Sequence, residues 1–289
     1  MKKRFTCSLT PLQNRIEKEL SGEDTPFFKA FSIVYPIIIY YAVSQLIILL
    51  FAYFMQWISV QDGGLLLLAE WFRENSLTVS GVVKGLSLIA GAAAVFFMFL
   101  GETPVFGLPS VYKKDIGVLF FLGAGAALSV NILFALLQFS SSSESYGQVA
   151  KQQFSFSLWA GIILYGVISP IAEEIVFRGI VYNRMRRQYS LWTALIGSSV
   201  LFGLYHGNIV QMVYGSLLGL LIVLLYEKYG SFLVPVILHG AANICVYVVT
   251  SNQRLSNLFM NRVGFFISFI IAAGLLWFTL SHLPASKEN

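Results

Sequence analysis

The sequence predicts an all-α, polytopic membrane protein of about eight transmembrane helices with a polar site inside the membrane. Of its 289 residues, 57% are hydrophobic and only 11% are charged, and the mean hydropathy is +0.74. Soluble domains carry about 25% charged residues, so this composition excludes a soluble fold. The apolar runs are continuous rather than alternating, which disfavours a transmembrane β-barrel.

Windows of about 20 residues, the length that crosses the hydrocarbon core of a bilayer, identify the candidate spans. In chain order they cover residues 30–56, 77–100, 115–139, 155–180, 190–206, 209–227, 231–250 and 262–282. The fifth is the shortest. Residues 62–72 are too few to cross a membrane, so we expect an interfacial or re-entrant piece there. The run SSSSES at 140–145 predicts a solvated loop.

Basic residues predict the orientation, because Lys and Arg accumulate in cytoplasmic loops. One side of the predicted topology holds Lys2, Lys3, Arg4, Arg15, Lys18, Lys29, Lys113, Lys114, Arg184, Arg186, Arg187, Lys228 and Lys287. The other side holds Arg73, Lys151, Arg254 and Arg262. We therefore expect a multi-pass protein of the cell membrane with both termini in the cytoplasm. Because the basic residues flank spans, the formal net charge of +5 does not predict nucleic-acid binding.

Other residues inside the spans predict packing rather than chemistry. The GAGAA run at 123–127 and the GxxxG pattern at Gly215–Gly219 predict close approach of helices. Lys84, inside the second candidate span, is expected to snorkel toward its outer end.

Two adjacent glutamates, Glu173 and Glu174, stand inside the apolar stretch of the fourth candidate span. Charged groups facing lipid are costly, so ionisable residues at membrane depth indicate a functional site. Glu174 and Arg178 are four residues apart, share a helix face and can pair. Glu173 lies about 100° around the helix from Glu174. We therefore expect Glu174 to be structural and Glu173 to be available for chemistry.

Further polar residues follow on later spans. His206 ends the fifth, whereas His239 and Asn243 are four residues apart on one face of the seventh. Alone, each has a structural explanation, since an intramembrane His or Asn commonly forms an interhelical hydrogen bond. Together they predict a shared interior cavity in which buried polar groups satisfy one another.

Two chemistries suit such a cavity. In one, a carboxylate and an imidazole deprotonate a water while a second imidazole and an amide stabilise an oxyanion. In the other, Glu173, His206 and His239 bind a divalent metal such as zinc. The residues leave both open, with a slight preference for the metal-free mechanism because Asn is not a usual zinc ligand.

Three motifs in order resemble a known family. They are EEIVFR at 173–178, FGLYH at 202–206 and HGAAN at 239–243. The pattern is similar to the CPBP family of intramembrane proteases, which includes CaaX-processing type II prenyl endopeptidases and Abi-type bacteriocin self-immunity proteins. The resemblance covers roughly residues 155–250. It implies an eight-helix membrane fold and hydrolysis of a peptide bond within or near the bilayer.

The resemblance also implies a role for each motif residue. Glu173 with His206 would activate water, and His239 with Asn243 would stabilise the oxyanion. Glu174 and Arg178 would hold the first site helix in place.

We divide the chain into four parts by composition and candidate spans, and the resemblance identifies the third. These are a polar cytoplasmic N-terminus (1–29), N-terminal transmembrane helices (30–150), a CPBP-like catalytic core (151–250), and the last transmembrane helix with the C-terminus (251–289). The expected partners are a peptide or membrane-protein substrate and the lipid bilayer, with the site reached from the cytoplasmic side or from the lipid. Alternatives are a non-proteolytic immunity or peptide-export partner, or a proton-coupled transporter.

Overall fold

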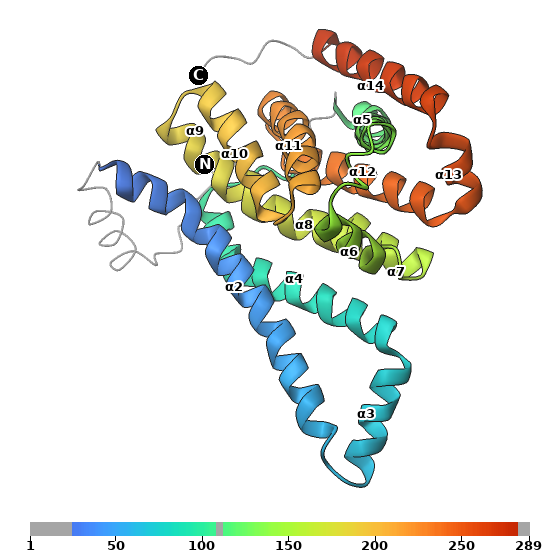
Figure 1. Cartoon of the computed structure of the whole chain (residues 1–289). Coiled ribbons are helices and arrows are strands. Elements are labelled where there is room, and N and C mark those ends of the chain that lie inside the picture. The colour runs from blue at the N-terminus through green and yellow to red at the C-terminus, as the bar shows by residue number, and fades with distance from the viewer. Residues whose placement is uncertain (1–24, 108–111, 283–289) are drawn as a thin grey trace.

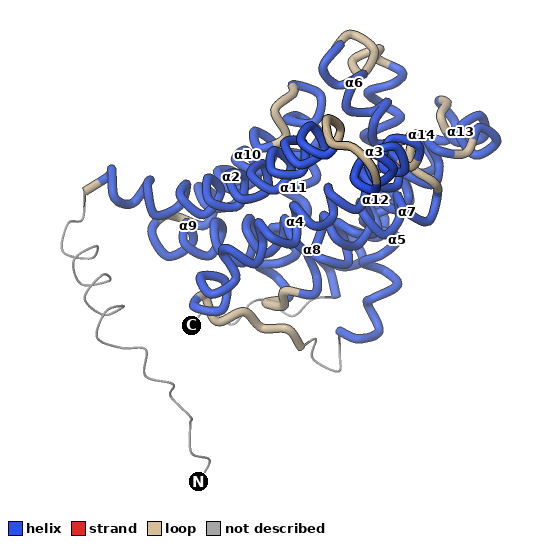
Figure 2. Tube along the Cα trace, turned by 90° about the horizontal axis from the view of Figure 1, so that it is seen from below, coloured by secondary structure: helices blue, strands red, loops and turns tan. Residues whose placement is uncertain are grey.

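The structure, a computed structural model, describes residues 25–107 and 112–282 and is helical throughout these ranges, without a β-strand (Figures 1 and 2). The α-helices are α2 (Pro26–Ile58), α3 (Gly64–Glu74), α4 (Ser76–Gly101), α5 (Ile116–Leu136), α6 (Glu144–Gln153), α7 (Leu158–Ile163), α8 (Ser169–Glu174), α9 (Asn183–Gln188), α10 (Leu191–Tyr205), α11 (Ile209–Tyr229), α12 (Leu233–Ser251), α13 (Gln253–Phe259) and α14 (Arg262–His282). Three shorter elements are η1 (Tyr112–Asp115), a 3₁₀ turn, and the π-helical segments η2 (Leu164–Ile168) and η3 (Ile175–Tyr182). The all-α prediction is confirmed.

Seven helices in the described ranges are long and apolar enough to cross a membrane. They are α2, α4, α5 with its preceding turn, the composite helix Leu158–Gln188, α11, α12 and α14. The fifth predicted span corresponds to α10, which has only 15 residues. At 1.5 Å per residue α10 is about 22 Å long, shorter than a hydrocarbon core of about 30 Å. The protein is an integral, multi-pass membrane protein, and α10 is the shortest of its candidate spans.

The first two spans form a hairpin that projects from the rest of the molecule (Figure 1). Its tip is α3, in which only Ala69 is buried. Helix α2 exposes large apolar side chains along most of its length, among them Phe31, Ile38 and Leu49. In a membrane protein such a surface faces lipid rather than water.

One loop prediction was wrong in part. The serine-rich segment is a loop only as far as Ser143, and α6 begins at Glu144. The Ser143 hydroxyl accepts a hydrogen bond from the backbone N–H of Tyr146 (3.3 Å), which caps the helix. Helix α6 has no buried residue. The polar composition therefore belongs to an exposed turn and to the exposed, capped helix that follows it.

The helix that carries the two glutamates is continuous from Leu158 to Gln188 but changes its winding twice. Pro170 has no N–H to donate, and its ring would clash with the carbonyl of Gly166 in a regular α-helix. The wider η2 segment contains Gly166 and relieves this conflict. The second wide segment, η3, begins directly after Glu174. Such π-helical segments occur often at functional sites.

The small residues allow close helix contacts, as predicted. A Cβ atom on Gly123 of α5 would overlap the backbone carbonyl of Leu238 in α12. A Cβ atom on Gly215 of α11 would lie 3.3 Å from the Cα atom of Gly203 in α10. The first contact fixes the position of α12, and the second fixes the pairing of α10 with α11.

We predict that Gly123→Ala lowers the stability of the protein by about 1–3 kcal/mol, the usual cost of overpacking. The added methyl group would push α12 away from α5. The matched control is Gly274→Ala in α14, where a Cβ atom meets nothing within 4 Å. Thermal unfolding in detergent micelles compares the two proteins. Equal melting temperatures would contradict the proposed contact.

Candidate active site

The predicted pair between Glu174 and Arg178 is present and fully buried. The two side chains are 0% and 1% exposed, and Arg178 Nη1 donates to Glu174 Oε1 over 2.8 Å. Arg178 Nη2 donates to the backbone carbonyl of Gly219 in α11 over 3.1 Å. The guanidinium carbon also lies 4.4 Å from the ring centroid of Phe202, a cation–π contact. Arg178 is therefore held from three directions.

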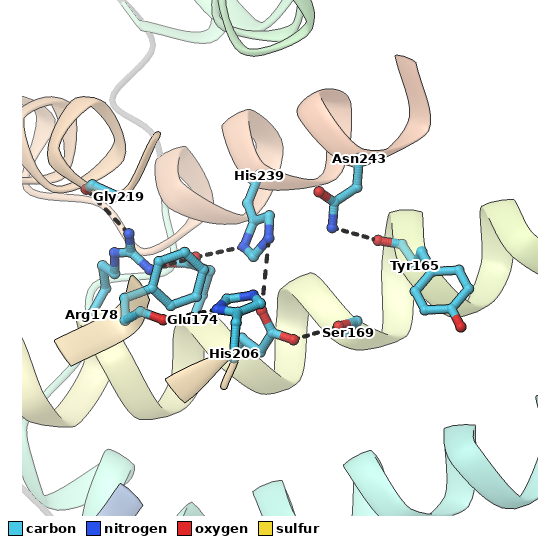
Figure 3. A network of polar contacts seen from close by, with 10 residues as sticks. Tyr165, Ser169, Glu174, Arg178, His206, Gly219, His239 and Asn243 are labelled. Atoms are coloured by element: carbon cyan, nitrogen blue, oxygen red, sulfur yellow. Dashed lines mark hydrogen bonds and ion pairs between the residues drawn. The ribbon is translucent and has the colours of Figure 1, made fainter. Parts of the chain in front are cut away.

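Glu174 has a second partner that the sequence analysis missed. Its Oε1 atom lies 2.7 Å from Nδ1 of His239 in α12 (Figure 3). Since a carboxylate paired with Arg178 only accepts hydrogen bonds, the proton of this contact is on His239 Nδ1. In the neutral imidazole, Nε2 then carries a lone pair. Glu174 thus orients His239 as well as neutralising Arg178.

Glu173 is also buried, but its carboxylate does not contact Arg178. Its Oε1 atom accepts a hydrogen bond of 2.5 Å from the hydroxyl of Ser169, one turn earlier in the helix. Its Oε2 atom lies 3.8 Å from Nε2 of His239. That separation is too long for a direct hydrogen bond, and such gaps between polar atoms commonly accommodate a water.

His206 follows the last residue of α10 and is half-buried. Its Nδ1 atom lies 2.9 Å from the carbonyl of Phe202, so Nδ1 carries the proton and Nε2 is left with a lone pair. Gly207 then adopts φ of +74°, and Asn208 caps α11. This tight turn places His206 between two packed helices.

Asn243 lies one turn after His239 on α12. Its side-chain amide donates one hydrogen bond of 2.9 Å to the carbonyl of Tyr165 in η2 (Figure 3). An amide nitrogen carries two protons, so a second donor remains.

A cavity of about 340 Å³ brings the predicted catalytic residues together. Its lining includes Glu173, His206, His239 and Asn243, but neither Glu174 nor Arg178. The predicted convergence of the four residues is therefore present, and the two predicted supporting residues lie outside the wall.

The cavity wall includes residues that the sequence analysis did not assign to the site. Lys84 of α4 lines the cavity instead of merely reaching toward the membrane surface. Ser169 and Tyr165 contribute through their contacts with Glu173 and Asn243. Ser169 stands four residues before Glu173, so helical spacing alone could have suggested this contact.

The side chains do not fit the zinc site that the sequence left open. Among residues 25–107 and 112–282, no three His, Cys, Asp or Glu side chains are arranged to hold a metal ion. As the side chains stand, the set Glu173, His206 and His239 is not arranged as a three-ligand site.

A comparison with protein families matches the segment that holds this site. Residues 155–245 match the Rce1-like family of type II CAAX prenyl endopeptidases. All six predicted site residues fall inside the matched segment. The resemblance that the three motifs suggested is confirmed.

Similar proteins occur in two bacteria. The "putative membrane peptidase YdiL" of Bacillus subtilis (strain 168) is 24% identical over 184 residues, which cover 61% of this chain and 74% of that protein. An uncharacterized 24.3 kDa protein of Escherichia coli is 26% identical, over 51% of this chain and 69% of its own length. The uncharacterized protein YpbD of B. subtilis (strain 168) is 26% identical, over 53% and 79%. No solved structure gives a significant match.

These similarities support a place in a superfamily of membrane proteases. At this level of similarity the superfamily implies a peptide or protein substrate in a lipid bilayer.

We predict that Arg178→Met lowers stability by about 3–5 kcal/mol, because it leaves the carboxylate of Glu174 buried without its cation. Arg186→Met is the control. Arg186 also pairs with a glutamate, Glu227, but its side chain is 43% exposed, so the loss should be about 0–1 kcal/mol. Thermal unfolding and yield of folded protein in detergent measure both. Similar losses in the two variants would contradict the structural role of Arg178.

Proposed function

We propose that this protein is an intramembrane endopeptidase in which Glu173 activates a water to hydrolyse a peptide bond. The observation that carries the proposal is that the two adjacent glutamates have different surroundings. Arg178 neutralises Glu174, whereas Glu173 points into the cavity and is left able to accept a proton. A carboxylate in a partly desolvated cavity, within reach of a water, is a suitable general base.

The position of the water follows from the acceptors around it. Oε2 of Glu173 and Nε2 of His239 lie 3.8 Å apart, and both accept hydrogen bonds when His239 is neutral. A water between them would donate one proton to each, which leaves its lone pair directed at the substrate. His206 lines the same cavity with its own Nε2 lone pair and can assist as the resemblance implies.

The reaction balances with these groups alone. The water oxygen forms a bond to the carbonyl carbon while Glu173 takes a proton, and the carbonyl electrons move onto the oxygen. When this intermediate collapses, the C–N bond breaks and Glu173 returns the proton to the leaving amine. The free N–H of Asn243 would stabilise the oxyanion. His239 could donate there only when Nε2 is protonated, because its Nδ1 proton is committed to Glu174.

We predict that Glu173→Gln abolishes hydrolysis and leaves the protein folded, because the amide keeps the shape but cannot accept a proton. The measurement compares membrane and secreted peptides from cells that carry wild-type or Glu173→Gln protein. The matched control, Glu144→Gln, makes the same carboxylate-to-amide change on the exposed helix α6. Cleavage products should disappear only in the Glu173→Gln cells.

An unchanged peptide profile in Glu173→Gln cells would contradict the protease proposal. It would favour a non-proteolytic membrane partner or a transporter on the same scaffold. Loss of the folded protein is separated from loss of chemistry by the melting temperature of the purified variant.

We predict that Asn243→Ala slows turnover by about 100- to 1,000-fold, the usual cost of losing one oxyanion donor. Substrate binding should change little, so the effect should appear in kcat rather than KM. Asn183→Ala is the control, since Asn183 likewise donates its amide to a backbone carbonyl, that of Gly179. A fall of kcat no larger than that of the control would contradict the role of Asn243.

Purified wild-type protein tests the metal-free mechanism. Activity should survive exhaustive chelation, and bound metal should be well below one per chain. A metalloprotease would instead hold about one metal and lose activity without it. Stoichiometric zinc, with activity restored only by adding it back, would overturn this part of the proposal.

A further inference from the structure

The basic loops of the described chain gather at one end of the helix bundle, here named the basic end. It comprises the first turn of α2, the end of α4, η1, α9 and the end of α11. Arg184 of α9 pairs with Glu102 at the end of α4 (2.9 Å) and donates to the carbonyl of Ser32 in α2 (2.7 Å). Arg186 pairs with Glu227 near the end of α11 (3.1 Å). These contacts hold together the ends that carry most of the positive charge.

The catalytic cavity lies toward the opposite end of the bundle. Helix α10 runs away from the basic end, and its last turn supplies Phe202 and Tyr205. Helix α11 returns, and its first turns supply Val210 and Gln211. The half of α12 remote from the basic end supplies Asn243 and Val246. Although α10 and α12 run away from the basic end and α11 runs toward it, each lines the cavity with the part that is remote from the basic end.

Exposed residues mark the mouth of the cavity. Besides its buried wall, the lining includes Val149 and Gln152 of α6, both exposed, and the half-buried Gln153 and Phe154 that follow. Helix α6 is polar and has no buried residue. Tyr41 of α2 also lines the cavity and is exposed, but it lies on a helix whose apolar surface faces lipid, so the opening to water is at α6.

The turn between α10 and α11 supports the same direction of access. Helix α11 runs 21 residues from this turn back to the basic end, a length of about 31 Å, so the turn lies near the opposite face of the membrane. The polar side chain of Gln211 lines the cavity next to this turn.

We infer that the substrate enters from the extracytoplasmic side, through a mouth beside α6, and not from the cytoplasm. The basic end is cytoplasmic by the positive-inside rule, and the mouth lies at the other end. The inference rests on the proposed hydrolysis and narrows its substrate class. The substrates are secreted peptides or the extracytoplasmic segments of membrane proteins, rather than the C-termini of cytoplasmic proteins.

Cysteine labelling tests the access side without any substrate. The two native cysteines, Cys7 and Cys245, are replaced by Ser in the full chain. Gln152→Cys then reports the mouth, and Lys228→Cys, also at an exposed position, reports the basic end. Each protein is first shown to react in detergent, and Ser142→Cys in the exposed turn before α6 replaces Gln152→Cys if that variant does not. A membrane-impermeant maleimide is then added to intact cells and to permeabilised cells.

The expected result is that the mouth position reacts in intact cells, whereas Lys228→Cys reacts only after permeabilisation. A mouth position that needs permeabilisation, or a Lys228→Cys that reacts in intact cells, would overturn the inference. Peptide termini that depend on Glu173 should in addition map to extracytoplasmic segments, and mapping to cytoplasmic proteins would overturn it as well. If the labelling is as expected but no peptide termini depend on Glu173, the proposed hydrolysis is wrong, whereas the extracytoplasmic position of the mouth is supported.

Discussion

The buried guanidinium of Arg178 is the constraint on which the rest of the site depends. A charge removed from water is tolerated only when its geometry and hydrogen bonds are complete. The partners of the Arg178 guanidinium are the carboxylate of Glu174, the carbonyl of Gly219 and the ring of Phe202. Because these groups belong to three separate helices, neutralising one side chain fixes three helices relative to one another. Glu174 extends the same network to His239 on a fourth.

Close packing makes that network geometrically possible. A Cβ atom at Gly219 would lie 3.2 Å from Arg178 Nη2, so a larger residue would crowd the guanidinium. A Cβ atom at Gly240 would lie 2.8 Å from the carbonyl of Gly166, where α12 crosses the wide η2 segment. The neighbouring His239 is thereby held against the glutamate helix. Small residues that the sequence marks only as packing sites thus set the distances on which the proposed chemistry relies.

The spans and the Glu174–Arg178 pair could be predicted because they follow from local spacing and composition. The contact between Glu174 and His239 could not, because 65 residues separate the partners and only tertiary packing joins them. Straight spans with the predicted bounds would also set His206 and Glu173 at different depths. The glutamate helix actually continues to Gln188, which puts Glu173 at its middle, and α10 is short. Helix α6 was missed because a polar, serine-rich segment carries no apolar period.

The pairing of charges within one helix has a consequence for biogenesis. The glutamate span leaves the ribosome before the spans that hold His206, Gly219 and His239 exist. A central charged residue adds about 2.5–3.5 kcal/mol to the insertion free energy of an isolated helix. Yet Arg178 and Glu174 already face each other one turn apart, and Ser169 reaches Glu173 at the same spacing. The span therefore enters the bilayer with partners for its charged groups already in place. Its insertion does not depend on the later helices that complete the site.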